Sequence, residues 1–503
     1  MKKEKLVLII DAGSSALKMF LIDKEGNTLA SVLKRWTIVS DELFPNVIEY
    51  GEKNLGDLLI GLINELFMEV GESREKLVGI SCISQRMNAV FMDKDDNILY
   101  FGPNIDSRGA LVDFQLSSED LEKIYNKTGH YPPFLFTPYR YMWFVENEKE
   151  LVEKIDKIMS IHDAIIYLLT GEFLTEPTIS SATMLMNIKS CKWDKEILSI
   201  FGIEGSLLPE IKRTGELAGY LREDVKDKLH IFRDVPVFLG GGDTQFGTLA
   251  TQAFDVGDVG CVIGYTAPVQ GIYDKPVVDP KRRLWTEKYI MESKWVVESN
   301  TGTFGGLIDW FIKSFLKELE EPYKWLSNVI EKAAPEQSLA KFYFGENIMD
   351  SSRMMDYKIF STIILPNPSI PFGKKETLET LAYGFVESLV FALIGNIEQV
   401  REIIGRKESS VGLTGGVTRI GGFNTLLASA LGEKCRVTSK HNGSALACAA
   451  IIYTNAGIFS SIEEALKTLV PCKEIKPDDD KVSALRNKYM DWRDYYERVN
   501  KHL

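Results

Sequence analysis

The chain has 503 residues, of which 45% are hydrophobic and 26% charged, proportions that are ordinary for a soluble globular protein. This length exceeds what one hydrophobic core usually serves, so we expect two large domains. The net charge of −12 disfavours a nucleic-acid-binding surface, which requires a clustered excess of Lys and Arg.

The sequence also gives no sign of secretion or membrane insertion. The first apolar run, Leu6–Ile10, is too short for the core of a signal peptide, and no uninterrupted run of eighteen apolar residues follows it. The six cysteines are scattered and form no C-x-x-C pair, so neither a zinc site nor a disulfide framework is indicated. We therefore expect a cytoplasmic protein with reduced thiols and no membrane or nucleic-acid partner.

Strand and helix patterns alternate along the chain, which predicts an α/β architecture. In the first half we expect a strand at Leu6–Ile10, its hairpin partner at Met19–Asp23, a helix at Leu55–Val70 and strands at Val78–Ile83 and Val237–Leu239. In the second half we expect strands at Val259–Ile263 and Val411–Leu413 and an amphipathic helix over Tyr383–Ile404 that is broken at Gly395. A helix rich in small residues should start at Asn442, and a charged terminal helix should cover Asp480–Leu503. Because both halves open with a strand, a Gly/Ser/Thr turn and another strand, we expect a duplication with a cleft between the halves. The boundary is placed at residue 246, giving domains 1–246 and 247–503.

The tip of the first hairpin is the first candidate site. Gly13 permits a tight turn, and the amides and hydroxyls of Ser14 and Ser15 can face phosphate oxygens. Lys18 adds a positive charge, and Asp11 can hold a magnesium-bound water. The alternative is a plain Asp-Gly hairpin turn. The segment lacks the spacing of a P-loop and of a G-x-G-x-x-G dinucleotide turn.

The second candidate follows the predicted strand Val237–Leu239, where three glycines precede Asp243. Glycines allow a sharp turn and close approach of a ligand, since no Cβ intervenes. A carboxylate at such a strand end can take a proton from a substrate hydroxyl. The alternative is a tight turn capped by an aspartate.

A third glycine-rich turn, Leu413–Asn424, leads into a helix. A flat ligand such as a purine nucleoside needs bare backbone on one side, which Gly415 and Gly416 supply. Alone, the turn is equally compatible with a glycine-rich helix entry. Three such turns, at the start, the middle and the last fifth of the chain, favour a shared ligand.

Taken in order, these motifs resemble those of the FGGY family of carbohydrate kinases, within the group of folds shared by actin, hexokinase and the heat-shock ATPases. The resemblance covers nearly the whole chain, and its strength lies in the collinear order of motifs that are individually weak. The matching segments are Asp11–Lys18, Arg140–Asn147 (with Arg where the family has Lys), His162-Asp163, Leu169–Glu172, Trp193-Asp194, Leu208–Glu210, Gly240–Asp243 and Thr414–Gly416.

The resemblance implies two RNase-H-like α/β domains of the actin, hexokinase and heat-shock ATPase type, with an interdomain cleft. It implies an ATP-dependent and Mg²⁺-dependent transferase that phosphorylates a hydroxyl of a small sugar or polyol. Asp243 would be the general base, and Asp11 and Asp243 would lie beside the metal. Besides Asp11, the residues implied in binding ATP are Gly13, Ser14, Ser15, Lys18, Gly264, Thr266, Gly302, Gly415, Gly416 and Asn424. An aspartate with an ordinary pKa is already a base at neutral pH, so little tuning is expected.

The resemblance places the sugar site at Gln85, Arg86 and Met87, at Asp106 and Arg108, and at Thr244 beside the catalytic aspartate. An Arg–Asp pair can grip a polyhydroxylated substrate, but it can equally be a structural salt bridge at a loop end. The first loop fits neither the xylulokinase nor the glycerol kinase pattern. The segments Ile263–Thr266 and Glu298–Gly302 look more like the autoinducer-2 kinase branch, whose substrate is a dihydroxyketone.

Two further functions stay open at this stage. The usual Gly-Thr-Ser of the second phosphate loop reads Gly264-Tyr265-Thr266-Ala267, so the chain could be a sensor that binds sugar and nucleotide with impaired transfer. It could also be an ATP-gated scaffold like actin or a heat-shock ATPase. Homodimers are common in the resembling family, although no residue here requires one.

Overall fold

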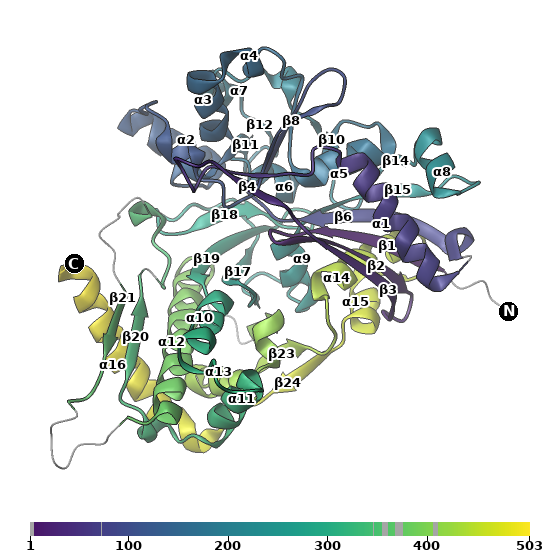
Figure 1. Cartoon of the computed structure of the whole chain (residues 1–503). Helices are drawn as coiled ribbons and strands as arrows, with labels where there is room; N and C mark the ends of the chain where they lie inside the picture. Colours follow the sequence, from purple (N-terminus) through teal and green to yellow (C-terminus); the bar gives the residue numbers. More distant parts are fainter. Residues whose placement is uncertain are drawn as a thin grey trace.

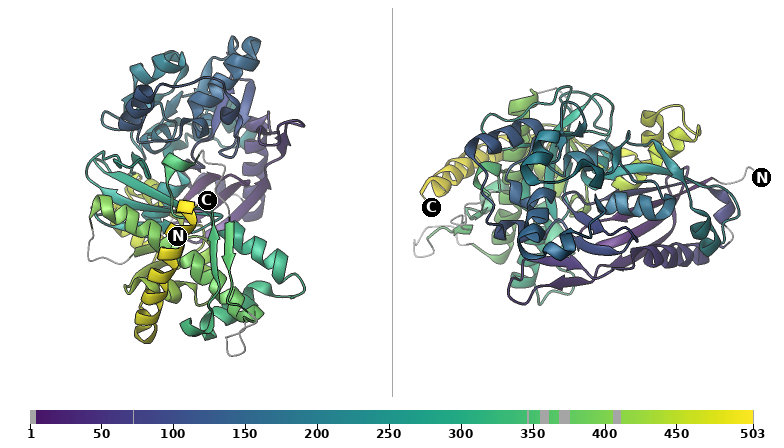
Figure 2. Two further views of the ribbon diagram at one scale, coloured as in Figure 1. Left: turned by 90° about the vertical axis from the view of Figure 1, so that its left-hand side faces the viewer. Right: turned by 90° about the horizontal axis from the view of Figure 1, so that it is seen from above.

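The computed structural model describes residues 5–71, 73–345, 347–354, 361–367, 376–405 and 411–502. Two large mixed sheets organise these residues, one formed by the first half of the chain and one by the second (Figure 1). Seen from the side, they belong to two lobes stacked one above the other (Figure 2).

The N-terminal sheet has six strands in the order β14-β15-β6-β1-β2-β3. Strands β1, β2 and β3 form an antiparallel meander, and β6 and β15 then add in parallel to β1. Their bounds are β1 Leu6–Ala12, β2 Ala16–Asp23, β3 Thr28–Arg35, β6 Leu77–Ser84, β14 Leu217–Tyr220 and β15 Pro236–Gly242.

The C-terminal sheet has seven strands in the order β18-β19-β17-β16-β22-β23-β24. It repeats the same plan, because an antiparallel β16-β17-β19 meander is followed by β22 and β23, which run parallel to β16. The bounds are β16 Val259–Val262, β17 Thr266–Tyr273, β18 Trp285–Lys288, β19 Trp295–Thr303, β22 Val411–Thr414, β23 Cys435–Thr438 and β24 Cys472–Ile475. The repeated topology agrees with the expected duplication, whereas the exact boundary at residue 246 stays a prediction.

Two helices lie between the sheets. Helix α9 (Asp243–Ala250) contacts β16, and α14 (Gly443–Asn455) contacts β1, β6 and α9. Their close approach depends on small residues: a Cβ at Gly247 would lie 2.7 Å from the Val262 side chain and 3.2 Å from Ser444 Oγ. The small-residue helix predicted from Asn442 is thereby confirmed.

The outer faces of the sheets are covered by further helices. On the N-terminal sheet these are α1 (Leu55–Val70) and α5 (Ile161–Thr170), with α8 (Glu223–Leu229) packed on α1. The C-terminal sheet packs on α12 (Leu378–Ile404), which contacts α11 (Pro322–Lys332), α13 (Phe423–Leu431) and α16 (Asp479–His502). A smaller unit above the N-terminal sheet contains β7 (Ala89–Met92), β8 (Ile98–Gly102), β9 (Lys157–Met159), α2 (Ser118–Thr128), α3 (Thr137–Asn147) and α7 (Lys195–Phe201).

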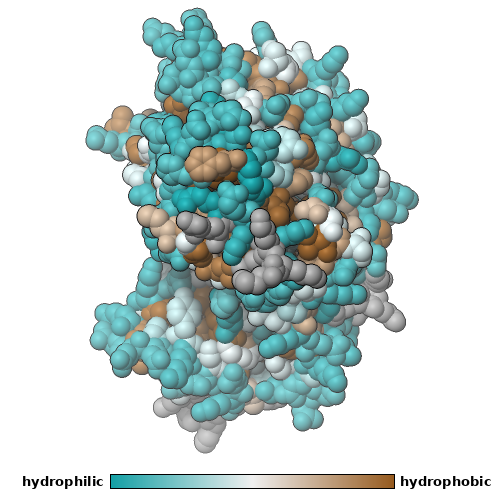
Figure 3. Space-filling model, turned by 90° about the vertical axis from the view of Figure 1, so that its right-hand side faces the viewer, coloured by the Kyte–Doolittle hydropathy of each residue, from teal (hydrophilic) through white to brown (hydrophobic). Residues whose placement is uncertain are grey.

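Helix α12 corrects one prediction. It runs unbroken through Gly395 and is buried on nearly all sides rather than amphipathic. The missing Cβ leaves room for neighbours, since a Cβ at this position would lie 2.3 Å from Ile348 and 2.8 Å from Arg493. By length and composition α12 could span a membrane, but 89% of its apolar window is buried inside the fold, as in a core helix. The face shown in Figure 3 is mostly hydrophilic, with scattered apolar side chains.

Candidate active site

The N-terminal sheet brings three predicted residues to one edge. Strands β1, β6 and β15 are parallel, with Ala12 paired to Ser84 and Ser84 to Gly242. Their carboxyl ends therefore meet, as in other parallel sheets whose ligands bind at that edge. Asp11 lies at the end of β1, Arg86 just after β6, and Asp243 begins helix α9 directly after β15.

Asp243 lies in a strongly charged environment. Burial, together with the negative charge of Asp11, raises the pKa of Asp243 to about 6, against the opposing effects of Arg86 and of a hydrogen bond from Thr244. The hydroxyl of Thr244 donates to Asp243 Oδ1 at 3.2 Å. Burial also raises the pKa of Asp11, while Lys18 counteracts it with Nζ 3.8 Å from Asp11 Oδ2. The expectation of an ordinary pKa for Asp243 is therefore replaced by a raised one.

The three glycines before Asp243 serve packing rather than a turn. Strand β15 continues through Gly242, and its register to β6 shifts between Phe238 and Gly241. A Cβ at Gly240 would lie 1.8 Å from the carbonyl oxygen of Cys82. Gly241 has φ +155°, and its Cβ would lie 2.5 Å from Thr178 Oγ1. Only glycine fits where this strand is pressed against its neighbours.

The two halves together line a cavity of about 440 Å³. Asp11 and Lys18 come from the N-terminal sheet, and Gly415 and Gly416 follow β22 at the matching edge of the C-terminal sheet. The remaining lining residues are Val262, Thr414, Thr418, Arg419, Val437–Ser439 and Lys440–Ala445. Two of the three predicted glycine-rich turns thus face one space, although they are about 400 residues apart.

A second cavity of about 590 Å³ adjoins the first, because Gly416 and Arg419 line both. It includes Gly264 and Tyr265 on one side and, on the other sides, Gly305, Ile308, Asp309, Tyr323, Lys324, Ser327, Val417 and Ile420. No atom lies within 4 Å of where a Cβ of Gly416 would be, so this backbone leaves open space toward the cavities. Gly415 is needed for another reason, since its φ is +107° and a Cβ would lie 2.3 Å from the Ile263 carbonyl.

The remaining predicted nucleotide residues lie in nearby turns and helices. Gly264 donates to the Thr266 carbonyl at 2.9 Å, which closes the turn between β16 and β17. Thr266 pairs with Thr303 across the sheet, and Gly302 has φ +67° at the exposed end of β19. The side-chain amide of Asn424 donates to the Thr418 carbonyl at 2.6 Å and holds the turn before α13.

The loop after β1 is fixed by aromatic side chains. Trp36 Nε1 donates to the Gly13 carbonyl at 2.8 Å, and the Trp36 amide donates to the Ser15 carbonyl at 3.3 Å. The hydroxyl of Tyr50 donates to the Ser14 carbonyl at 2.7 Å. Tyr50 and Trp36 are stacked with ring centroids 4.8 Å apart. The carbonyls of this loop are thus directed into the protein.

Arg86 is held between two buried glutamates of the C-terminal sheet. Its guanidinium contacts Glu287 on β18 and lies 2.8 Å from Glu298 on β19. Glu287 also accepts a hydrogen bond from Gln245 and lies 3.0 Å from His130 Nε2. The predicted sugar-binding arginine therefore also links the two halves directly behind Asp243.

The neighbours of Arg86 in the loop after β6, Gln85 and Met87, make contacts within the protein. Gln85 donates to the Tyr50 hydroxyl at 2.8 Å and accepts from the Asn104 amide at 3.1 Å. Met87 has φ 55° and is half-buried against the hydrophobic core of the smaller unit above the N-terminal sheet. Thus Gln85 ties the loop after β6 to the loop after β1 through Tyr50.

Asp106 and Arg108 form the structural salt bridge considered above. Arg108 Nε lies 2.7 Å from Asp106 Oδ2, and both side chains are at most 1% exposed. Asp106 also accepts from the Ile48 amide at 3.0 Å and contacts the Tyr100 hydroxyl. The Arg108 guanidinium is 4.4 Å from the Tyr100 ring centroid. The salt bridge is therefore present, and sugar binding by this pair stays a prediction.

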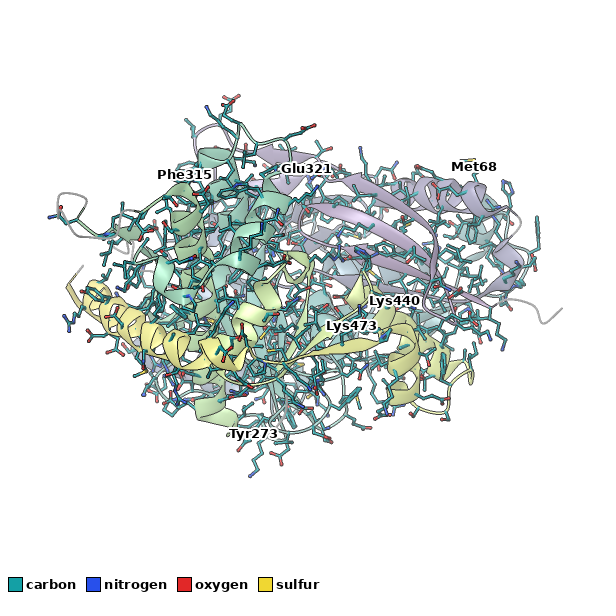
Figure 4. All side chains as sticks on the ribbon, turned by 90° about the horizontal axis from the view of Figure 1, so that it is seen from below. Met68, Tyr273, Phe315, Glu321, Lys440 and Lys473 are labelled. Atoms are coloured by element: carbon teal, nitrogen blue, oxygen red, sulfur yellow. The ribbon has the colours of Figure 1, made fainter. Side chains whose placement is uncertain are left out.

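Several residues of the cleft were missed from the sequence. Glu287 lies in a strand with no local motif, and Gln245 was overlooked two residues after Asp243. Glu298 begins a segment that was quoted for its resemblance, but its contact with Arg86 was not predicted. Lys440 lies where the C-terminal segment approaches the N-terminal strands (Figure 4), and its Nζ donates to the Glu25 carbonyl at 2.5 Å. A signal did exist for Lys440, since it closely precedes Asn442-Gly443, the predicted helix start.

The residues fit a nucleotide and a magnesium ion, although within the described ranges no group of three or more His, Cys, Asp or Glu side chains could hold a metal. Magnesium needs no such group, because it usually binds one or two carboxylates plus phosphate oxygens and water. Asp11 and Asp243 supply two half-buried carboxylates. Gly416 supplies bare backbone and Lys18 a cation at the cavity wall.

Comparison with solved structures establishes the fold class. Xylulose kinase from Lactobacillus acidophilus superimposes with a TM-score of 0.85 at 19% identity and covers 99% of both chains. Plasmodium falciparum glycerol kinase with ADP superimposes with a TM-score of 0.83 at 22% identity, covering 99% of this chain and 98% of that one. The protein therefore has the two-domain α/β fold of the actin and hexokinase type.

The sequence comparisons identify the family. Residues 6–250 match the N-terminal domain model of the FGGY family of carbohydrate kinases. Autoinducer-2 kinase of Escherichia coli (strain K12) is 23% identical over 510 residues, which cover 98% of this chain and 93% of that protein. YoaC of Bacillus subtilis (strain 168), provisionally named a sugar kinase, is 28% identical over 305 residues, an alignment spanning 61% of either protein. Residues 6–250 therefore form a domain of the FGGY family of carbohydrate kinases, and the relatives that align along the rest of the chain support the same family for the whole protein.

Proposed function

We propose that the protein transfers the γ-phosphoryl group of ATP to a hydroxyl of a small, polyhydroxylated acceptor, with Asp243 as general base. The observation that carries the proposal is the meeting of Asp243 and Asp11 at one sheet edge, beside a cavity lined by Lys18, Gly415 and Gly416. A nucleotide with its phosphates in this cavity would present the terminal phosphate near both carboxylates. Its base and ribose fit the adjoining cavity at Gly264 and Gly416.

For this reaction the protein has to align the acceptor oxygen with the γ-phosphorus and to stabilise the charge on the phosphates. The carboxylate of Asp243 accepts the proton of the acceptor hydroxyl while that oxygen bonds to the γ-phosphorus and the bond to ADP breaks. A base with a pKa of about 6 is mostly ionised at neutral pH and is stronger than an ordinary aspartate. Asp11 and Asp243 would hold Mg²⁺, and the ion would neutralise charge on the phosphates.

The acceptor class is proposed from the relatives. Autoinducer-2 kinase aligns over nearly the whole chain, so an autoinducer-2-type dihydroxyketone is the first acceptor to test. Ketoses and glycerol follow, because xylulose kinase and glycerol kinase share the fold. We propose that the enzyme is cytoplasmic, as its sugar kinase family suggests, and that a homodimer is compatible with its fold.

The test is ADP release with Mg²⁺, ATP and a panel of dihydroxyketones, ketoses and polyols. We expect acceptor-dependent release with at least one compound. Asp243→Asn should lower kcat by about 10²–10⁴-fold with little change in nucleotide affinity. The exposed Asp274→Asn is the matched control, which should leave kcat unchanged. If acceptors bind but no phosphate is transferred, the chain is instead a sensor, and the proposal fails.

A further inference from the structure

The backbone amide of Gly242, the residue before Asp243, donates a hydrogen bond to a side chain of another helix. Gly242 N donates to Thr178 Oγ1 at 2.8 Å, and Thr178 is completely buried on α6 (Pro177–Ser181). This contact lies where strand β15 ends, beyond the register shift in its ladder with β6. A side-chain hydroxyl therefore fixes the peptide group from which the catalytic helix α9 begins.

Thr178 is in turn fixed by Glu176, which has no exposed surface. Glu176 Oε1 accepts from the Thr178 hydroxyl at 2.5 Å and from the Ile179 amide at 2.6 Å. Its other oxygen accepts from the Thr178 amide at 3.0 Å and from the Thr214 hydroxyl. Burial raises the pKa of Glu176, against the opposing effect of these hydrogen bonds. Four donors converge on its two oxygens, and this geometry sets the direction of the Thr178 hydroxyl.

The direction of this segment is set by its contacts, which are the ladder to β6 and the hydrogen bond to Thr178. Gly241 has φ +155°, and two consecutive glycines allow many backbone directions. A rotation of this peptide would swing Asp243 away from Asp11, and a misplacement of about 1 Å can cost about 10²-fold in rate.

We propose that Thr178 and Glu176 are positioning residues, which hold the Gly241–Gly242 backbone so that Asp243 faces the acceptor hydroxyl. The proposal rests on the function proposed above for Asp243. It assigns to α6 a role in catalysis without contact to substrate or nucleotide.

The experiment compares Thr178→Val, which keeps the shape but removes the hydroxyl, with Thr178→Ser, which restores it. Ser180→Ala is the matched control, since its hydroxyl is equally buried on the same helix and donates to the Glu176 carbonyl at 2.8 Å. Each variant is assayed for kcat, for the KM of acceptor and nucleotide, and for hydrogen exchange of the peptide spanning 236–246.

We expect Thr178→Val to lower kcat by about tenfold or more, with each KM changed less than twofold and with faster exchange at 236–246. Thr178→Ser should recover most of kcat, and Ser180→Ala should leave kcat and this exchange unchanged. The proposal is overturned if Thr178→Val keeps full kcat, or if Ser180→Ala lowers kcat equally. If the parent protein transfers no phosphate, the proposed function fails, whereas exchange at 236–246 still decides whether Thr178 fixes this backbone.

Discussion

The raised pKa of Asp243 predicts an acid limb in the pH profile near pH 6. Burial and the charge of Asp11 raise this pKa to about 6, and only the ionised carboxylate can accept the acceptor's proton. The ionised fraction is then about 90% at pH 7, about 50% at pH 6 and about 10% at pH 5. We expect kcat/KM for the acceptor to fall about tenfold between pH 7 and pH 5, measured at fixed ionic strength.

The assignment of this limb is tested by Asp11→Asn. Removing the negative charge of Asp11 removes one cause of the raised pKa, so the limb should move to lower pH. The overall rate will also fall if Asp11 helps to hold magnesium, and therefore the position of the limb, not its height, is compared. Asp274→Asn should leave the position unchanged. A wild-type limb near pH 4, or one that Asp11→Asn does not move, would refute the reasoning.

Three further outcomes follow from the same contacts, each measured by chemical unfolding without ligands. The pKa of Asp243 is raised from 3.8 to about 6 on folding, so its ionised form opposes folding above pH 6. Solvent reaches the half-buried side chain and weakens this effect, so Asp243→Asn should stabilise the fold by about 1–2 kcal/mol at pH 7. This gain should vanish below pH 4, where the folded and unfolded proteins both carry the proton, and a gain that persists there would contradict the cause given. Gly240→Ala, whose Cβ would lie 1.8 Å from the Cys82 carbonyl, should destabilise by about 3 kcal/mol, and a loss within error would show that the strand can shift. Glu298→Ala leaves the buried Arg86 with one partner fewer and should cost about 3–5 kcal/mol, whereas an unchanged midpoint would mean that water replaces the carboxylate.

Local sequence patterns were enough to locate the strands around the cleft. The strands predicted at Leu6–Ile10, Val78–Ile83 and Val411–Leu413 are confirmed within one or two residues, because apolar runs bounded by glycine and polar residues leave few alternatives. Helix α12 shows the limit of this reasoning. Its Gly395 was interpreted as a break, but the space beside it is filled by Ile348 and Arg493, which no local pattern identifies.

Within the site, the sequence indicated which types of residue are present better than it indicated why each one is needed. The glycines before Asp243 were interpreted as a turn for a ligand, whereas Gly240 and Gly241 are needed because β6 and α6 lie against the strand. Arg86 was predicted at the sugar site, and this role stays a prediction. The bonds of its guanidinium to Glu287 and Glu298, more than 200 residues away, were not predicted. Contacts of this kind arise from tertiary packing and leave no spacing to recognise.

The charges around Asp243 give a physical reason for the expected dependence on magnesium. Asp11, Asp243, Glu287 and Glu298 are carboxylates, and Arg86 and Lys18 are the cations paired with them in this part of the described structure. A nucleotide triphosphate would add further negative charge to a region where negative charge already predominates and water is scarce, which is costly without compensation. A bound Mg²⁺ would offset part of this charge, whereas Arg86 offsets only one of the two negative charges of the buried Glu287 and Glu298 and already contacts both side chains. We therefore expect ATP to bind weakly without magnesium, and the two carboxylates left to attract the metal are those of Asp11 and Asp243.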